Sequence, residues 1–110
     1  MARYEFQVKG SVAEPYTVTF ERSGANLTAL CTCKAAQNGQ HCKHRLEIMR
    51  GESKGIVSDN VADAASVPAM VDGSDVEPYL REVERLEAEA GEIKKRLAGA
   101  KKTLARRMMD

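Results

Sequence analysis

The chain has 110 residues, enough for one small domain and some additional chain. Its 17 Lys+Arg and 16 Asp+Glu leave a net charge of +1, which gives no whole-chain argument for nucleic acid or an anionic membrane as the partner. No apolar run approaches the roughly 20 residues of a membrane helix, and the first residues lack the apolar core of a signal peptide. We therefore expect a cytoplasmic protein that does not bind a membrane.

Apolar residues alternate with polar ones in the first third of the chain, which is typical of strands with one buried face. Two runs show the alternation clearly: Tyr4, Phe6 and Val8, then Tyr16, Val18 and Phe20. Gly10 and Pro15 separate the runs, and residues 23–26 (Ser-Gly-Ala-Asn) form a turn signal. Residues 27–31 then predict a third strand. The pattern indicates a small antiparallel β-sheet.

A short helix is expected after the third strand, over residues 43–49. Leu46 and Met49 would face inward, and Gly51 would end the helix. We assign residues 1–50 to one domain on this basis.

Residues 51–74 are rich in Gly, Ser, Ala and Asp, and we expect them to form a partly helical linker. Ser58 is a candidate N-cap for a short helix that carries Val61 and Ala64. Pro68 would either end that helix or start another one, because proline lacks the N–H that a helix interior needs.

The three cysteines of the chain lie within 12 residues, in the pattern Cys31-x-Cys33-x8-Cys42-x-His44. An odd number of cysteines without an export signal argues against a disulfide framework. In extended chain, residues i and i+2 point to the same side, so each pair can present two ligands together. Three thiolates and an imidazole are a complete ligand set for one structural Zn²⁺ ion.

Three other interpretations of this cluster stay open. His41 competes with His44 as the fourth ligand, although only His44 completes the matched one-residue spacing. Redox chemistry of the cysteines is a second alternative, and chance clustering of small buried side chains is a third.

Residues 16–49 closely resemble the SWIM-type zinc finger, whose signature is Cys-x-Cys, a variable gap, then Cys-x-His. In that family a β-hairpin precedes the ligands and a short helix follows them. The resemblance covers about residues 4–50 and places Cys31, Cys33, Cys42 and His44 on the four ligand positions. It implies a zinc-binding module for DNA or protein partners. The chain departs from the family at Ala35 and Ala36, near which an aromatic residue is common.

Residues 75–110 predict a long helix. Ser74-Asp75-Val76-Glu77 is a capping-box signature, and Pro78 suits the first helical turn. Apolar residues then follow the 3–4 spacing of a coiled coil for more than four heptads. We call these positions the seam, and they form the expected dimer interface: Val76, Tyr79, Val83, Leu86, Ala90, Ile93, Leu97, Ala100 and Leu104.

The simplest partner for this seam is a second copy of the chain. Acids dominate residues 75–92 and bases dominate residues 93–109, so an antiparallel pairing sets unlike charges against each other. The alternative is an amphipathic helix that lies on its own domain.

Together these features predict an α+β protein: a small antiparallel β-sheet with a short helix around zinc, followed by a long coiled-coil helix. The expected function is a zinc-binding adaptor for an unidentified protein partner, dimeric through its C-terminal helix. Nucleic-acid binding is the alternative, because residues 1–54 have eight bases and five acids, a net charge of +3. We expect no enzymatic activity, since no catalytic carboxylate pair or nucleophile–base motif stands out.

Overall fold

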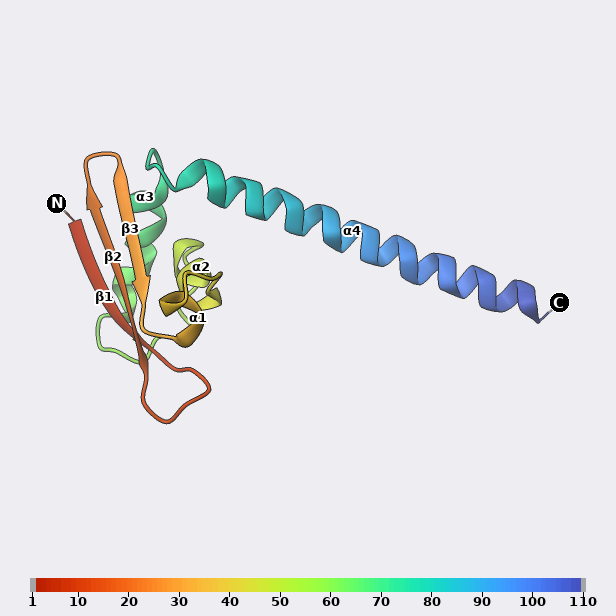
Figure 1. Cartoon of the computed structure of the whole chain (residues 1–110), viewed down its shortest axis with the longest axis horizontal. Helices are drawn as coiled ribbons and strands as arrows, with labels where there is room; N and C mark the ends of the chain where they lie inside the picture. The colour runs from red at the N-terminus through yellow and green to blue at the C-terminus, as the bar shows by residue number, and fades with distance from the viewer. Residues whose placement is uncertain (1, 110) are drawn as a thin grey trace. The chain divides into compact units, whose positions relative to one another are not determined.

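Alternating apolar residues produce a three-stranded antiparallel sheet in the computed structural model, which describes residues 2–109 (Figure 1). The strands are adjacent in the sheet in chain order: β1 (Ala2–Val8), β2 (Tyr16–Ser23) and β3 (Asn26–Cys31). Phe6 pairs with Val18, and Val18 pairs with Cys31. Since paired residues point to the same face, the apolar face of the sheet leads directly to the first cysteine. All three predicted strands are confirmed.

Four short helical segments complete the first part of the chain: α1 (Lys34–Gln37), α2 (Lys43–Met49), the 3₁₀ helix η1 (Val61–Ser66) and α3 (Val67–Val71). Helix α2 has the predicted bounds. Gly51 follows it with φ +89°, a left-handed conformation that glycine adopts without strain. Helix α1 was not predicted, and none of its residues is buried.

The inward face of α2 differs from the expectation. Leu46 is buried as predicted, but Ile48 is buried in place of Met49, which is only half-buried. Helix α2 contacts both β3 and α3. Helix α2 is therefore covered on two sides, whereas the sequence predicted one buried face with Leu46 and Met49 on it.

Residues 51–74, expected to be a linker, contribute to the core of the same compact unit, which spans Met1–Glu77. The largest fully buried side chains come both from the sheet and from this segment: Phe6, Val18, Phe20, Val67 and Val71. The rings of Phe6 and Phe20 meet edge to face, with their centroids 6.3 Å apart. Each such burial stabilises the fold by about 1.5–3 kcal/mol.

The capping role expected of Ser58 is wrong. Its hydroxyl accepts a hydrogen bond from the Gln7 N–H (3.1 Å) and donates one to Asn60 Oδ1 (2.7 Å), so it fixes the segment to β1. Residue 60 precedes η1, which begins at Val61. Pro68 lies in the first turn of α3, so the restart of a helix at this proline is confirmed.

Helix α4 (Glu77–Met108) forms nearly all of the second compact unit, Pro78–Asp110. It begins at Glu77, two residues later than Asp75, where we expected it to begin. The Glu77 carboxylate accepts a hydrogen bond from the Gly73 N–H (3.1 Å), while the Ser74 N–H is bonded to the Val71 carbonyl. The reciprocal capping box is therefore not formed. Over residues 2–109, no helix combines the length and the apolar character needed to cross a bilayer.

Candidate metal centre

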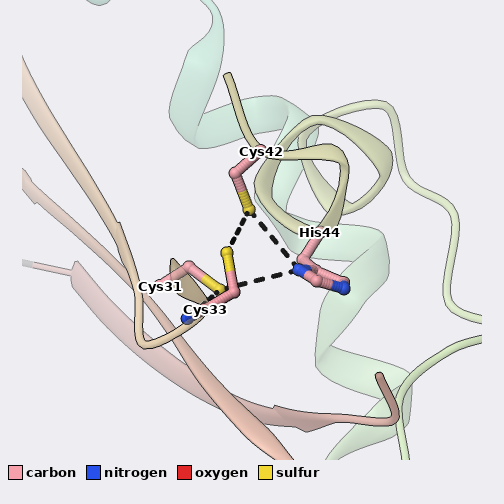
Figure 2. Close-up of side chains that lie close together, drawn as sticks. All are labelled: Cys31, Cys33, Cys42 and His44. Atoms are coloured by element: carbon pink, nitrogen blue, oxygen red, sulfur yellow. Dashed lines mark hydrogen bonds between the residues drawn. The ribbon is translucent and has the colours of Figure 1, made fainter. Parts of the chain in front are cut away.

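Four side chains that the sequence singled out converge at one end of β3 (Figure 2). Cys31 is the last residue of β3, and Cys33 directly precedes α1. Cys42 precedes α2, and His44 lies in the first turn of that helix. Their ligand atoms all lie within 4.8 Å of one another; the three cysteines are buried and the histidine is half-buried.

The separations of these atoms suit one tetrahedral metal ion. With Zn–S bonds near 2.3 Å, the ligand atoms of a tetrahedral site lie roughly 3.5–3.8 Å apart. The Sγ atoms of Cys33 and Cys42 are 3.4 Å apart. The Nδ1 atom of His44 is 3.5 Å from Cys42 Sγ and 3.8 Å from Cys31 Sγ. The donor set and its geometry therefore fit a single metal site.

Backbone pairing beyond the strands fixes the first ligand pair. The Thr32 N–H donates to the Thr17 carbonyl (3.1 Å), and the Thr17 N–H donates to the Thr32 hydroxyl (2.9 Å). The Cys33 N–H points at Cys31 Sγ (3.4 Å), an arrangement that stabilises a thiolate. The turn between the two cysteines is thus held to β2 by the Thr32–Thr17 hydrogen bonds, and within itself by the contact from the Cys33 N–H to Cys31 Sγ.

The second ligand pair is brought back by a loop that Arg45 clamps to the sheet. Gly39 turns the chain with φ +72°. The Arg45 guanidinium then donates to the carbonyls of Ala29 in β3 (3.2 Å) and Gln40 in the loop (2.8 Å). Since both partners of Arg45 are backbone carbonyls, no side-chain pattern in the sequence could have indicated this role.

The local environment shifts the pKa values of two of the thiols, Cys31 and Cys33, in opposite directions. Burial raises the pKa of the Cys31 thiol to about 12. Burial acts in the same direction on Cys33, but hydrogen bonds with the Ala36 backbone and with the side chains of His44, Cys42 and Cys31 together outweigh it and lower the pKa to about 6. Metal ligation requires the thiolate form, so binding of a cation displaces the proton of Cys31.

His44, and not His41, belongs to the cluster. The ring of Tyr16 packs against the His44 ring at a centroid distance of 5.0 Å and helps to orient it, a role that the sequence did not reveal. His41 is exposed and lies outside the group of four. The arrangement favours the ligand assignment made from the one-residue spacing.

We expect His44→Ala to lower metal retention at least tenfold, because it removes one of four ligands. His41→Ala should leave retention nearly unchanged and serves as the matched control. Elemental analysis of the two purified variants after dialysis measures the difference. Equal losses, or a larger loss at position 41, would show that the assignment is wrong.

All the seam residues except Val76, which precedes the helix, lie on α4, and among the described residues that unit holds no other helix or strand to cover them. Most of them are exposed, from 37% at Val83 to 76% at Tyr79, and Val76 is half-buried. Leu80, which is not a seam position, is buried. The seam is therefore an apolar surface of α4.

Comparison of the chain with protein-family models, curated proteins and solved structures finds no match.

Proposed function

We propose that this chain is a zinc-binding interaction module, with a SWIM-type zinc finger in its first half and a helix that forms a homodimer. The observation that carries the proposal is the convergence of three cysteine sulfurs and one histidine nitrogen on one point. Soft thiolates and an imidazole in a tetrahedral arrangement are the preferred ligands of Zn²⁺.

Four protein ligands leave no coordination position for water or substrate, which supports a structural ion and a role other than catalysis. The ion would tie β3 to α2 across the short loop between the two ligand pairs. The thiolates need a reducing environment, and this supports a cytoplasmic location.

The adaptor role rests on α4. Helix α4 has 32 residues and a continuous apolar seam. Exposure of this seam to water is unfavourable, because burial of each large side chain stabilises by about 1.5–3 kcal/mol. A second copy supplies the complementary surface, and the finger is then presented twice to a protein partner. Nucleic-acid binding remains the alternative function.

The test is elemental analysis of the full chain purified without added metal. We expect about one zinc per chain, since a closed Cys₃His set binds zinc tightly. Retention of less than ~0.3 equivalents by a protein with native-like circular dichroism would contradict the proposal.

A further inference from the structure

A cavity of about 530 Å³ lies beside the metal centre, entirely within residues 1–77. Its lining includes three lysines, Lys9, Lys43 and Lys54, together with Tyr16 and His44. The histidine thus closes the metal site and also forms part of the cavity wall. Among residues 2–109, none of those that line the cavity carries a carboxylate.

Backbone hydrogen bonds pair the segments that carry two of these lysines, Lys9 and Lys54. The Lys9 N–H donates to the Gly55 carbonyl (2.9 Å), and the Val57 N–H donates to the Gln7 carbonyl (2.8 Å). This isolated antiparallel bridge holds residues 55–57 against the end of β1, so Lys9 and Lys54 lie on adjoining segments that both line the cavity. These hydrogen bonds are made by the main chain and by neither lysine side chain, and they offset the electrostatic repulsion between the two lysine charges.

The third lysine is placed by the metal centre. Lys43 lies between the ligands Cys42 and His44 and is the first residue of α2. Any ion that fixes its two neighbours also fixes the backbone of Lys43. The complete set of three lysines is for this reason expected in the metal-loaded protein.

These lysines are a local concentration of positive charge in an otherwise acidic unit. Residues 1–77 contain eight Lys+Arg and ten Asp+Glu, a net charge of −2, and only four lysines, of which three line the cavity. Within residues 2–109, no ion pair or side-chain hydrogen bond engages Lys9, Lys43 or Lys54. Three uncompensated ammonium groups around one cavity attract a multiply charged anion.

One wall of the cavity is built tightly. A Cβ atom added at Gly10 would overlap the ring of Tyr16, so only glycine lets the ring lie against this backbone. The same ring packs on His44. Tyr16 therefore connects the loop after β1 to the metal centre and gives the cavity a fixed apolar side.

We propose that this cavity binds the phosphate groups of a small phosphorylated molecule, with Lys9, Lys43 and Lys54 as the cationic donors. Ammonium groups bind phosphate as point charges, and three of them match the charge of a diphosphate. A long nucleic-acid strand is disfavoured, because the surrounding unit carries net negative charge and the lysines converge on one cavity instead of following a strand.

Pyrophosphate is the probe, titrated into the zinc-loaded full chain at low salt and followed by calorimetry and by NMR of the backbone amides. We expect saturable binding with shifts at residues 9–11 and 54–57. Lys9→Gln and Lys54→Gln should each weaken binding about tenfold, as expected for loss of one charge-assisted contact. Lys34→Gln, which removes the same charge next to Cys33 but outside the cavity, should have little effect.

Zinc content and thermal unfolding of each variant are measured in parallel, and they should match those of the unchanged chain. No pyrophosphate binding below about 10 mM, or equal weakening by Lys34→Gln, would overturn the proposal. A single-stranded oligonucleotide that binds through Lys9 and Lys54, in a protein that does not bind pyrophosphate, would also overturn it and assign the cavity to nucleic acid. The result does not depend on dimerisation of α4.

Discussion

Removal of the metal, by a strong chelator or by Cys33→Ser, is expected to destabilise residues 1–77 by roughly 5 kcal/mol or more. The reason is that residues 34–49 bury few apolar side chains, so apart from the four clustered side chains they are held chiefly by the hydrogen bonds of Arg45. Helix α1 has no buried residue, and α2 contributes only Leu46 and Ile48 to the core. Since small domains are stable by only about 5–15 kcal/mol, much of the metal-free population should lack this segment or the whole fold.

Thermal unfolding followed by circular dichroism, with and without chelator, measures this loss. Gln37→Ala changes an exposed side chain in the same loop and is the matched control, expected to lie within about 0.5 kcal/mol of the unchanged chain. Readdition of zinc should restore the transition for the unchanged chain and not for Cys33→Ser. Cooperative unfolding of the metal-free protein at nearly the same temperature as the metal-loaded protein would contradict the coupling of folding to metal binding.

The strands and the four clustered side chains could be predicted because their signals are local. Alternation at spacing two needs only neighbouring residues, and it gave the apolar face of β1 and β2 directly. The paired Cys-x-Cys and Cys-x-His spacings likewise report a geometry that a few residues of chain determine. No knowledge of distant contacts was required for either prediction.

Residues 51–74 were harder to interpret because their structure is decided by contacts that are distant in sequence. Small residues and a proline resemble a linker, yet Val67 and Val71 are fully buried in the core. Ser58 has the side chain of a helix cap but bonds to Gln7, 51 residues earlier. Tertiary partners decided both outcomes, and composition could not reveal them.

The cavity beside the metal centre shows the same limit. Lys9, Lys43 and Lys54 form no pattern in the sequence, where each is separated from the next by ten or more residues. They line one cavity because residues 55–57 pair with the end of β1 and because α2 starts between Cys42 and His44. The overall composition, with its balanced charge, concealed this local excess.

The helix α4 is expected to pair with a second copy in the antiparallel direction, and substitution of one seam leucine should abolish this dimer. In the antiparallel register the residue numbers of facing positions sum to 183. The facing layers are then Val76–Arg107′, Tyr79–Leu104′, Val83–Ala100′, Leu86–Leu97′ and Ala90–Ile93′. Large side chains face small ones in two of these layers, which suits close packing.

Charges next to the seam favour this direction over the parallel one. Antiparallel pairing sets Glu89 against Arg96′ and Glu87 against Lys94′, both attractive. Parallel pairing would set Glu82 against Glu87′ and Arg96 against Lys101′, both repulsive, and only its Glu89–Lys94′ pair would be attractive. Each exposed pair is worth only a few tenths of a kcal/mol. Symmetry repeats every pair, however, so the preference accumulates and should weaken as salt is added.

Light scattering on the full chain measures the dimer, and Leu97→Lys tests the seam. The Leu86–Leu97′ layer occurs twice in the dimer, so the substitution removes two buried leucines and should weaken association about a thousandfold or more. Ala88→Lys adds the same charge on an exposed position of α4 outside the seam and should leave the dimer intact.

Direction is tested by crosslinking of a peptide of residues 75–110, which contains no native cysteine. Tyr79→Cys combined with Leu104→Cys should give a disulfide-linked dimer, because positions 79 and 104′ face each other in the antiparallel register. Tyr79→Cys alone should not crosslink, since its copies lie near opposite ends of a helix pair about 48 Å long (32 residues at 1.5 Å each). Efficient crosslinking of the single variant would establish the parallel direction, and a strictly monomeric full chain would remove the basis for the dimer itself.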